Sequence, residues 1–228
     1  NFNNLKMIDT NVGWAETKKN RILVTNDSWN TYKDVTPEKY PLQFEEKKTF
    51  FLDDKRGWLF FTINSKNKRQ LEEFFTNDQG NSWNYKIFST INDWGIEDVQ
   101  FINDKEGWLY TSKFHEAAGI LPSKLYHTKN SGDSWEQVSL TGLFNSTYKW
   151  IYFLDSKRGW SIGQTLNKGT DYFNTSATTL FETSDGGATW KSYDLIKQDN
   201  TNSIDYGKPY FFGSYGILPA VQYPLNMK

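Results

Sequence analysis

Short apolar segments alternate with polar turns along the whole chain. The segments are rich in Phe, Tyr, Trp, Ile and Thr, and Asn, Asp, Gly and Lys bound them. This is the composition of β-strands joined by hairpins. No stretch shows the period of an amphipathic helix. The pattern therefore predicts an all-β protein.

One phrase recurs four times, as an apolar run, a polar turn and a Gly-Trp pair. The four copies are Met7–Trp14, Phe51–Trp58, Phe101–Trp108 and Phe153–Trp160. Their Gly-Trp pairs lie 44, 50 and 52 residues apart. A fixed period of this size indicates one structural unit copied along the chain.

A second phrase, of the type Thr-x-Asp-x-Gly-x-Thr-Trp, follows each copy of the first. Its copies are Thr25–Tyr32, Thr76–Trp83, Thr128–Trp135 and Thr183–Trp190. Each unit then holds four antiparallel strands in about fifty residues, which is typical of a β-propeller blade.

We therefore predict a single propeller domain over residues 1–228, with about four and a half blades of a six- to eight-bladed ring. The expected blades are 1–38, 47–90, 97–140, 148–196 and a partial blade at 208–228, in which Gly216 replaces the Gly of Gly-Trp. An open sheet edge is a liability. Residues beyond this sequence, or another chain, would complete the ring.

The second phrase has a structural explanation. Its Asp can accept backbone N–H groups of its own turn, its Gly adopts a positive φ, and its Trp packs between blades. The first copy has Trp29 in place of Gly and Tyr32 in place of Trp, so we expect a distorted turn there. The residues given this structural role are Asp27, Asp78, Gly80, Trp83, Asn130, Gly132, Trp135, Asp185, Gly187 and Trp190.

These phrases resemble Asp-boxes, also called BNR repeats. Proteins with such repeats include sialidases, xyloglucan-cleaving glycosidases, sortilin-like receptors and propeller-type photosystem II assembly factors. The additional Phe-x-Asp-x-x-x-Gly-Trp hairpin is most similar to the assembly-factor branch and its bacterial relatives. The resemblance implies a propeller and leaves the activity open, because one scaffold hosts many functions.

Composition narrows the classes of partner. The net charge is −1, so no basic surface for nucleic acid is expected. No apolar stretch reaches the roughly 18 residues of a membrane span. Cysteine is absent and no metal-ligand spacing is found, so we expect no metal site and no cofactor. The lack of cysteine and the Asn- and Lys-rich composition suit a bacterial protein that is secreted or in the cell envelope.

Function is expected on the face opposite the repeated turns. Both turn phrases lie on one face of the disc, the lower face, so the variable loops and blade connections form the upper face. Acids and exposed aromatic residues there would suit a carbohydrate or protein ligand. The candidate binding residues are Trp94, Glu97, Asp98, His115, Glu116, Trp150, Asp171, Tyr172, Asp205 and Tyr206.

Two functions remain from this sequence. A sialidase-like site needs three arginines to clamp a carboxylate. The chain has four arginines, and Arg56 and Arg158 lie in lower-face turns. Only Arg21 and Arg69 are left, which are too few for this clamp. A two-carboxylate glycosidase stays open. We expect a non-catalytic binding or assembly module, with a glycoside hydrolase whose full site needs residues outside this chain as the alternative.

Overall fold

The fold is all-β. The computed structural model describes residues 2–65, 68–88, 94–113, 123–139, 146–165, 177–195, 202–212 and 215–224. Within these ranges there is no helix, and every strand pairing is antiparallel. No helix there is long and apolar enough to span a membrane.

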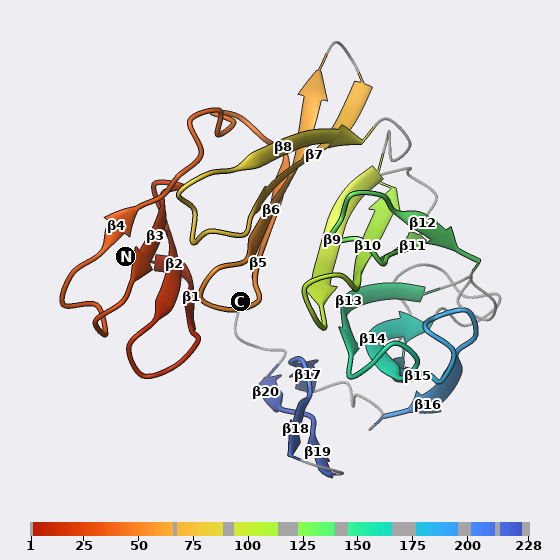
Figure 1. Ribbon diagram of the computed structural model, residues 1–228. Helices are drawn as coiled ribbons and strands as arrows, with labels where there is room; N and C mark the ends of the chain where they lie inside the picture. Colours follow the sequence, from red (N-terminus) through yellow and green to blue (C-terminus); the bar gives the residue numbers. More distant parts are fainter. Residues whose placement is uncertain are drawn as a thin grey trace.

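Four sheets of four strands follow one another around an arc (Figure 1). We call them blades 1 to 4. Each is a meander whose strands pair in chain order. The strands of blade 1 are β1 (Phe2–Met7), β2 (Gly13–Thr17), β3 (Ile22–Thr25) and β4 (Lys33–Asp34). Those of blade 2 are β5 (Glu46–Phe51), β6 (Gly57–Ser65), β7 (Lys68–Thr76) and β8 (Asn84–Phe88). Those of blade 3 are β9 (Trp94–Phe101), β10 (Gly107–Lys113), β11 (Ser123–Thr128) and β12 (Glu136–Val138). Those of blade 4 are β13 (Ser146–Phe153), β14 (Gly159–Thr165), β15 (Ala177–Thr183) and β16 (Lys191–Asp194).

A fifth unit of two-stranded sheets continues the arc beside blade 4 (Figure 1). Its strands are β17 (Asn202–Tyr206), β18 (Tyr210–Phe212), β19 (Tyr215–Ile217) and β20 (Ala220–Pro224). β17 pairs with β20, and β18 pairs with β19. Phe211 lies opposite Gly216, as Phe51 lies opposite Gly57 in blade 2. Gly216 therefore takes the place of the Gly in Gly-Trp, as the sequence predicted.

We call each copy of the second phrase a box. The Asp or Asn side chain of each box accepts hydrogen bonds from its own turn. Asp78 Oδ1 accepts the Ser82 N–H at 2.9 Å and the Thr76 hydroxyl at 2.8 Å, and Oδ2 accepts the Ser82 hydroxyl at 2.6 Å. Asp27 and Asp185 make the same bonds with Thr31 and Thr189. Asn130 keeps the backbone acceptor through its Oδ1. These hydrogen bonds are the ones expected of a side chain that fixes its own turn.

The first box is not distorted, and this expectation was wrong. Trp29 has a φ of 68°, in the same left-handed region as Gly80 at 74°. Its N–H donates to Thr25 Oγ1 at 3.0 Å, just as the Gly80 N–H donates to Thr76 Oγ1 at 2.9 Å. The turn hydrogen bonds thus impose a backbone conformation that side chains other than Gly resist.

The two repeated turns of each blade lie side by side. The N–H groups of Gln79, Ser131 and Gly186 donate to Lys55, Lys105 and Lys157 carbonyls, each at 2.8 Å. Ser28 makes the corresponding bond to Asn11 at 2.9 Å. The two phrases therefore share one face, as expected.

Stacked aromatic pairs join each blade to the next. Trp58 of blade 2 stacks on Phe101 of blade 3 with ring centroids 3.8 Å apart, and Trp108 stacks on Phe153 at 3.9 Å. A Cβ on Gly107 would lie 2.6 Å from the Phe101 ring. Only glycine leaves room for the phenylalanine to lie flat across the strand. Trp14 and Phe51 form the same pair between blades 1 and 2.

One carboxyl is enclosed between blades 2 and 3. Glu73 on β7 is 2% exposed, and its carboxyl faces the box of blade 3, where a Cβ on Gly132 would lie 2.9 Å from Oε1. Burial raises the pKa of Glu73 to about 8, against a smaller opposite effect of Lys86. Among the described residues, neither Glu73 Oε2 nor Trp135 Nε1 makes a hydrogen bond of normal geometry.

We expect Asp78→Ala to lower the free energy of unfolding by ~1–3 kcal/mol, because it leaves turn N–H and hydroxyl groups without their acceptor. Asp78→Asn is the matched control and should lower the free energy of unfolding far less, since Asn130 already accepts the corresponding backbone N–H in blade 3. Urea unfolding of the three proteins measures the difference. Equal losses for both variants would contradict this role for the carboxylate oxygens.

We expect Glu73 to make stability fall as the pH rises. At pH values between the ordinary pKa of a glutamate and about 8, Glu73 carries a proton in the folded protein but has lost it in the unfolded chain. The contribution of Glu73 to the free energy of unfolding is therefore most favourable below this pH range and is lost as the pH rises through it. Glu73→Gln stays neutral, so its melting temperature minus that of the wild type should grow from pH 5 to pH 9. A difference that is constant with pH would refute the assignment.

Candidate functional site

For five of the ten candidate binding residues, the structure describes both the backbone and the side chain. Glu97 and Asp98 lie on β9, Trp150 on β13, and Asp205 and Tyr206 on β17. Trp94 begins β9, and its side chain is not described. His115, Glu116, Asp171 and Tyr172 lie outside the described residues. Asp205 is exposed.

Asp98 joins three parts of the chain. It is nearly buried, and its Oδ2 accepts the backbone N–H of Ile151 in blade 4 at 2.8 Å. Its Oδ1 accepts the Val99 N–H at 3.0 Å and the Lys208 ammonium at 2.8 Å. Lys208 precedes β18, so this carboxylate links blade 3, blade 4 and the fifth unit. Its oxygens are occupied by the fold itself.

Trp150 and Tyr206 are buried, which corrects the expectation of exposed aromatic rings. They are 6% and 8% exposed and form a core cluster with Ile162. Trp150 Nε1 donates to the Tyr206 carbonyl at 3.0 Å. Their rings fill the junction between blade 4 and the fifth unit, so they offer no open face for stacking on a sugar.

Glu97 occupies a bulge. In the pairing of β9 with β10, Asp98 lies opposite Tyr110 and Ile96 opposite Thr111, so Glu97 falls outside the register. Corresponding shifts leave Asn3 of β1 and Lys149 of β13 outside the register of their strand pairs. A bulge redirects the side chain of the extra residue. The Glu97 carboxylate accepts the hydroxyl of Ser112 on β10.

Glu46 is a site residue that the sequence interpretation missed. Its carboxyl lies against blade 3, where a Cβ on Gly95 would fall 2.5 Å from Oε2. Oε2 is buried and has no hydrogen-bond partner among the described residues. Burial raises the pKa of Glu46, and the negative charge of Glu97 raises it further. Gly95 was the available signal, because a glycine inside a strand often marks a close approach.

Other acids of the upper face are paired with cations. Glu16 forms a buried ion pair with Lys47, whose ammonium also donates to Asn20 Oδ1 at 2.8 Å and to the Tyr40 hydroxyl at 3.0 Å. Burial, and then the charge of Glu16, raise the pKa of Tyr40. These contacts link blades 1 and 2, so the charges there brace the junction.

All four arginines of the chain form ion pairs with acids. The upper-face pairs are Arg21 Nε with Asp34 Oδ2 at 2.6 Å and Arg69 Nε with Glu45 Oε2 at 2.5 Å. In the lower-face turns, Arg56 and Arg158 each bind the Asp three residues before them at 2.7 Å. The four guanidinium groups therefore do not converge on one site.

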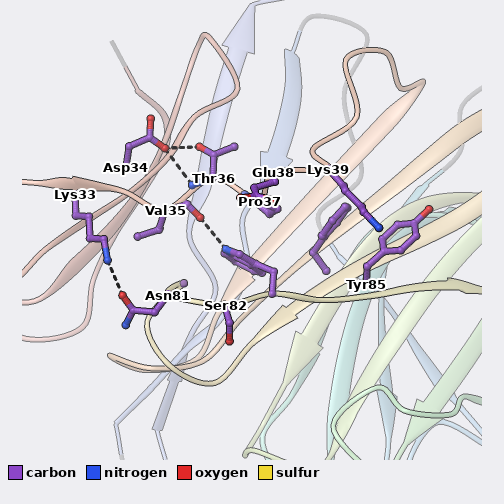
Figure 2. A pocket seen from close by; sticks show the side chains of 13 residues that line it. Lys33, Asp34, Val35, Thr36, Pro37, Glu38, Lys39, Asn81, Ser82 and Tyr85 are labelled. Atoms are coloured by element: carbon purple, nitrogen blue, oxygen red, sulfur yellow. Dashed lines mark hydrogen bonds between the residues drawn. The ribbon is translucent and has the colours of Figure 1, made fainter.

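A cavity of about 440 Å³ lies between blades 1 and 2, beside the second box (Figure 2). Many of its polar groups bond to each other. Trp83 Nε1 donates to the Val35 carbonyl at 2.7 Å, and Lys33 Nζ donates to Asn81 Oδ1 at 2.6 Å. Asp34 accepts the N–H and hydroxyl of Thr36. This cavity borders the lower face and contains none of the candidate residues.

His127 has a structural place. Its ring stacks on Trp108 with centroids 4.6 Å apart, and Nε2 lies 2.9 Å from Glu106 Oε1. Burial lowers the pKa of His127. In the part of the chain that is described, no three His, Asp or Glu side chains come together in a way that could hold a metal ion.

No protein-family model matches this sequence, and no curated protein matches it either. Solved structures do resemble the chain. The GH74 enzyme of Niastella koreensis is similar with a TM-score of 0.56 and 10% identity, over 81% of this chain and 28% of that one. The α-L-arabinofuranosidase Arb93A of Fusarium graminearum has a TM-score of 0.53 and 10% identity, over 92% and 70%. YCF48 bound to a D1 peptide has a TM-score of 0.44 and 12% identity, over 95% and 87%.

The first two likenesses support the β-propeller fold and, at such identities, the fold alone. The chain spans about a quarter of the length of the GH74 enzyme that it resembles. Propellers of this kind include glycosidases, so the fold is compatible with both a binding protein and an enzyme.

We expect Asp98→Ala to lower the free energy of unfolding by ~1–3 kcal/mol, because it leaves the buried Ile151 N–H without an acceptor. Lys208→Met is the matched control. It removes only the partly exposed ion pair, which contributes at most ~1 kcal/mol. Urea unfolding of both variants measures the two effects. Full stability in Asp98→Ala would show that Asp98 does not brace the blades.

Proposed function

We propose that this chain is a non-catalytic propeller that binds a partner through its upper-face loops and blade connections. The observation that carries the proposal is the pairing of the arginines. Arg21 and Arg69, the two on the upper face, are each held by an acid of their own region. A sialidase-like clamp needs several guanidinium groups directed at one substrate carboxylate. The paired arginines do not supply that arrangement.

The described acids support the same proposal. Asp98 is bound by Ile151 and Lys208, and Glu97 by Ser112. Asp98 thus joins neighbouring blades and Glu97 joins two strands of blade 3, as expected of a scaffold that presents loops. A protein partner fits better than a sugar, because Trp150 and Tyr206 are buried while Leu42, in the connection between blades 1 and 2, is 98% exposed. We also propose that the protein acts outside the cytoplasm, in line with its lack of cysteine.

A glycoside hydrolase is the second candidate function, and the pair Glu46 and Glu97 favours it. Glycosidases divide their chemistry between a carboxylic acid with a raised pKa and a second carboxylate. Glu46 has the raised pKa, its buried Oε2 has no hydrogen-bond partner in the described part of the chain, and the charge of Glu97 is close enough to raise that pKa. Under this alternative Glu46 would donate the proton to the leaving group, and Glu97 would be the second carboxylate.

Hydrolysis of a panel of chromogenic glycosides, run beside glycan-array binding, separates the two functions. Under the non-catalytic proposal we expect no turnover by the wild type. Turnover that is lost in both Glu46→Gln and Glu97→Gln would establish the hydrolase instead. Glu45→Gln is the matched control, since Glu45 neighbours Glu46 but is paired with Arg69. Turnover that persists in both variants would exclude this pair as the catalytic groups.

A stability measurement tests whether the Glu46 carboxyl destabilises the folded protein. Glu46→Gln removes the negative charge from a half-buried carboxyl whose Oε2 has no hydrogen-bond partner among the described residues, so we expect its melting temperature at pH 7 to rise above that of the wild type. Glu45→Gln should lower it slightly through the lost ion pair. A fall in the melting temperature of Glu46→Gln would show that the carboxylate stabilises the fold.

A further inference from the structure

The cavity of about 440 Å³ between blades 1 and 2 lies at the outer rim of the arc. Its walls are β4 and the turn that follows it on one side, and the second box and β8 on the other. β4 and β8 are each the last strand of their sheet, and Figure 1 shows both on the outside of the arc. Blades 1 and 2 each have four strands and both repeated turns, so the cavity belongs to a complete junction. Its volume is within the range of ligand pockets, ~300–1,000 Å³.

A fixed turn after β4 forms the wall on blade 1. The Tyr40 N–H donates to the Pro37 carbonyl at 3.1 Å, which closes the turn. Pro37 is buried, and the Tyr40 ring meets Phe61 edge-on with centroids 4.9 Å apart. The turn is thus anchored at both ends, and the exposed residues Glu38 and Lys39 occupy its tip.

The charged groups at the tip of this turn are available to a ligand. Among the described residues, neither the Glu38 carboxylate nor the Lys39 ammonium makes a hydrogen bond or an ion pair. Figure 2 shows Lys39 extended toward the Tyr85 ring. The other charged residues of the lining, Lys33 and Asp34, are already bonded to protein groups. The cavity therefore offers one ammonium donor and one carboxylate acceptor.

An aromatic ring on β8 forms the opposite wall. Tyr85 is 38% exposed, and its ring packs on Phe74 with centroids 4.9 Å apart. Burial, and then a hydrogen bond from its hydroxyl to the Glu72 carboxylate, raise the pKa of Tyr85 to about 12. Trp83 lies beside it, and its Nε1–H is taken by the Val35 carbonyl at 2.7 Å. The Tyr85 ring is therefore held in place with part of its surface open.

The lining selects the chemistry of the ligand. Its charged residues are two lysines and two acids, so the walls carry no net charge, and most of the lining is polar. Sugar hydroxyl groups donate to a carboxylate and accept from an ammonium, and the C–H groups of a sugar ring pack on an aromatic ring. An apolar peptide side chain in the same place would desolvate Glu38 and Lys39 without giving them a partner, which is unfavourable.

We propose that this cavity binds a neutral carbohydrate. One sugar ring stacks on Tyr85, and its neighbouring hydroxyl groups donate to the Glu38 carboxylate and accept from the Lys39 ammonium. Because the turn and the aromatic ring are both held by the protein, the site is formed before the sugar binds, which lowers the entropic cost of binding. The site lies apart from the upper-face loops, so this proposal and the proposed function can each fail without the other.

Titration calorimetry with neutral hexasaccharides of glucose, xylose and mannose tests the class of ligand. We expect at least one of them to bind saturably, with one site per protein. An oligogalacturonate of the same length should bind at least tenfold more weakly, because the cavity has no excess of positive charge to balance its carboxylates. Absence of saturable binding by all three neutral sugars, or equal binding of the oligogalacturonate, would overturn the proposal.

Protein variants locate the site. Tyr85→Ala removes the stacking ring and should weaken the sugar at least tenfold. Lys39→Met removes a free donor at an exposed position, so it should weaken binding severalfold while the melting temperature stays close to that of the wild type. Tyr193→Ala is the matched control. Tyr193 is an exposed tyrosine of β16 that also donates to a glutamate, Glu182, but it lies outside the cavity lining, so this variant should bind as the wild type does.

Binding that is unchanged in both Tyr85→Ala and Lys39→Met would place the sugar elsewhere on the protein and would overturn the proposal. Equal losses in Tyr85→Ala and Tyr193→Ala would also contradict it, because they would show a general effect of removing a surface tyrosine.

Discussion

The stacking of a tryptophan from one blade on a phenylalanine from the next is the contact on which the rest of the structure depends. It exists because a glycine opposite each phenylalanine lets the ring lie flat across the paired strand. The tryptophan then covers that ring and, in blades 2 and 3, donates its indole N–H to the box of the following blade. One apolar contact and one hydrogen bond thus set the position of each blade relative to its neighbour.

Because of this constraint, the polar residues on the two faces of the molecule have different roles. On the lower face the two repeated turns of a blade bond to each other, and the turns of blades 3 and 4 also accept a tryptophan N–H from the preceding blade, so these backbone groups serve the fold. On the upper face the sequence varies, and pairs such as Glu16 with Lys47 join the blades there instead. Glu46 departs from this rule, since its buried Oε2 has no hydrogen-bond partner among the residues that the structure describes. It is therefore the upper-face group for which a chemical role is easiest to argue.

The turns were predictable from the sequence, whereas the status of the upper-face residues was not. Asp78 and its counterparts act on atoms within four residues, so their role could be seen in the local pattern. Asp98 and Trp150 meet groups more than fifty residues away, and no local pattern indicates these partners. The error at Trp29 has a different origin, because the bond that holds its backbone is local. A residue ill suited to a left-handed turn is held there by the hydrogen bonds around it.

The sequence by itself determined the fold class, the order of strands within each blade and the face that carries the repeated turns. These follow from short-range periodicity and turn chemistry, which every copy repeats. Only the tertiary structure decided which of the described acids are paired across blades and which aromatic rings are buried. Those properties depend on contacts between blades, where side chains distant in sequence compete for the same space and the same hydrogen bonds.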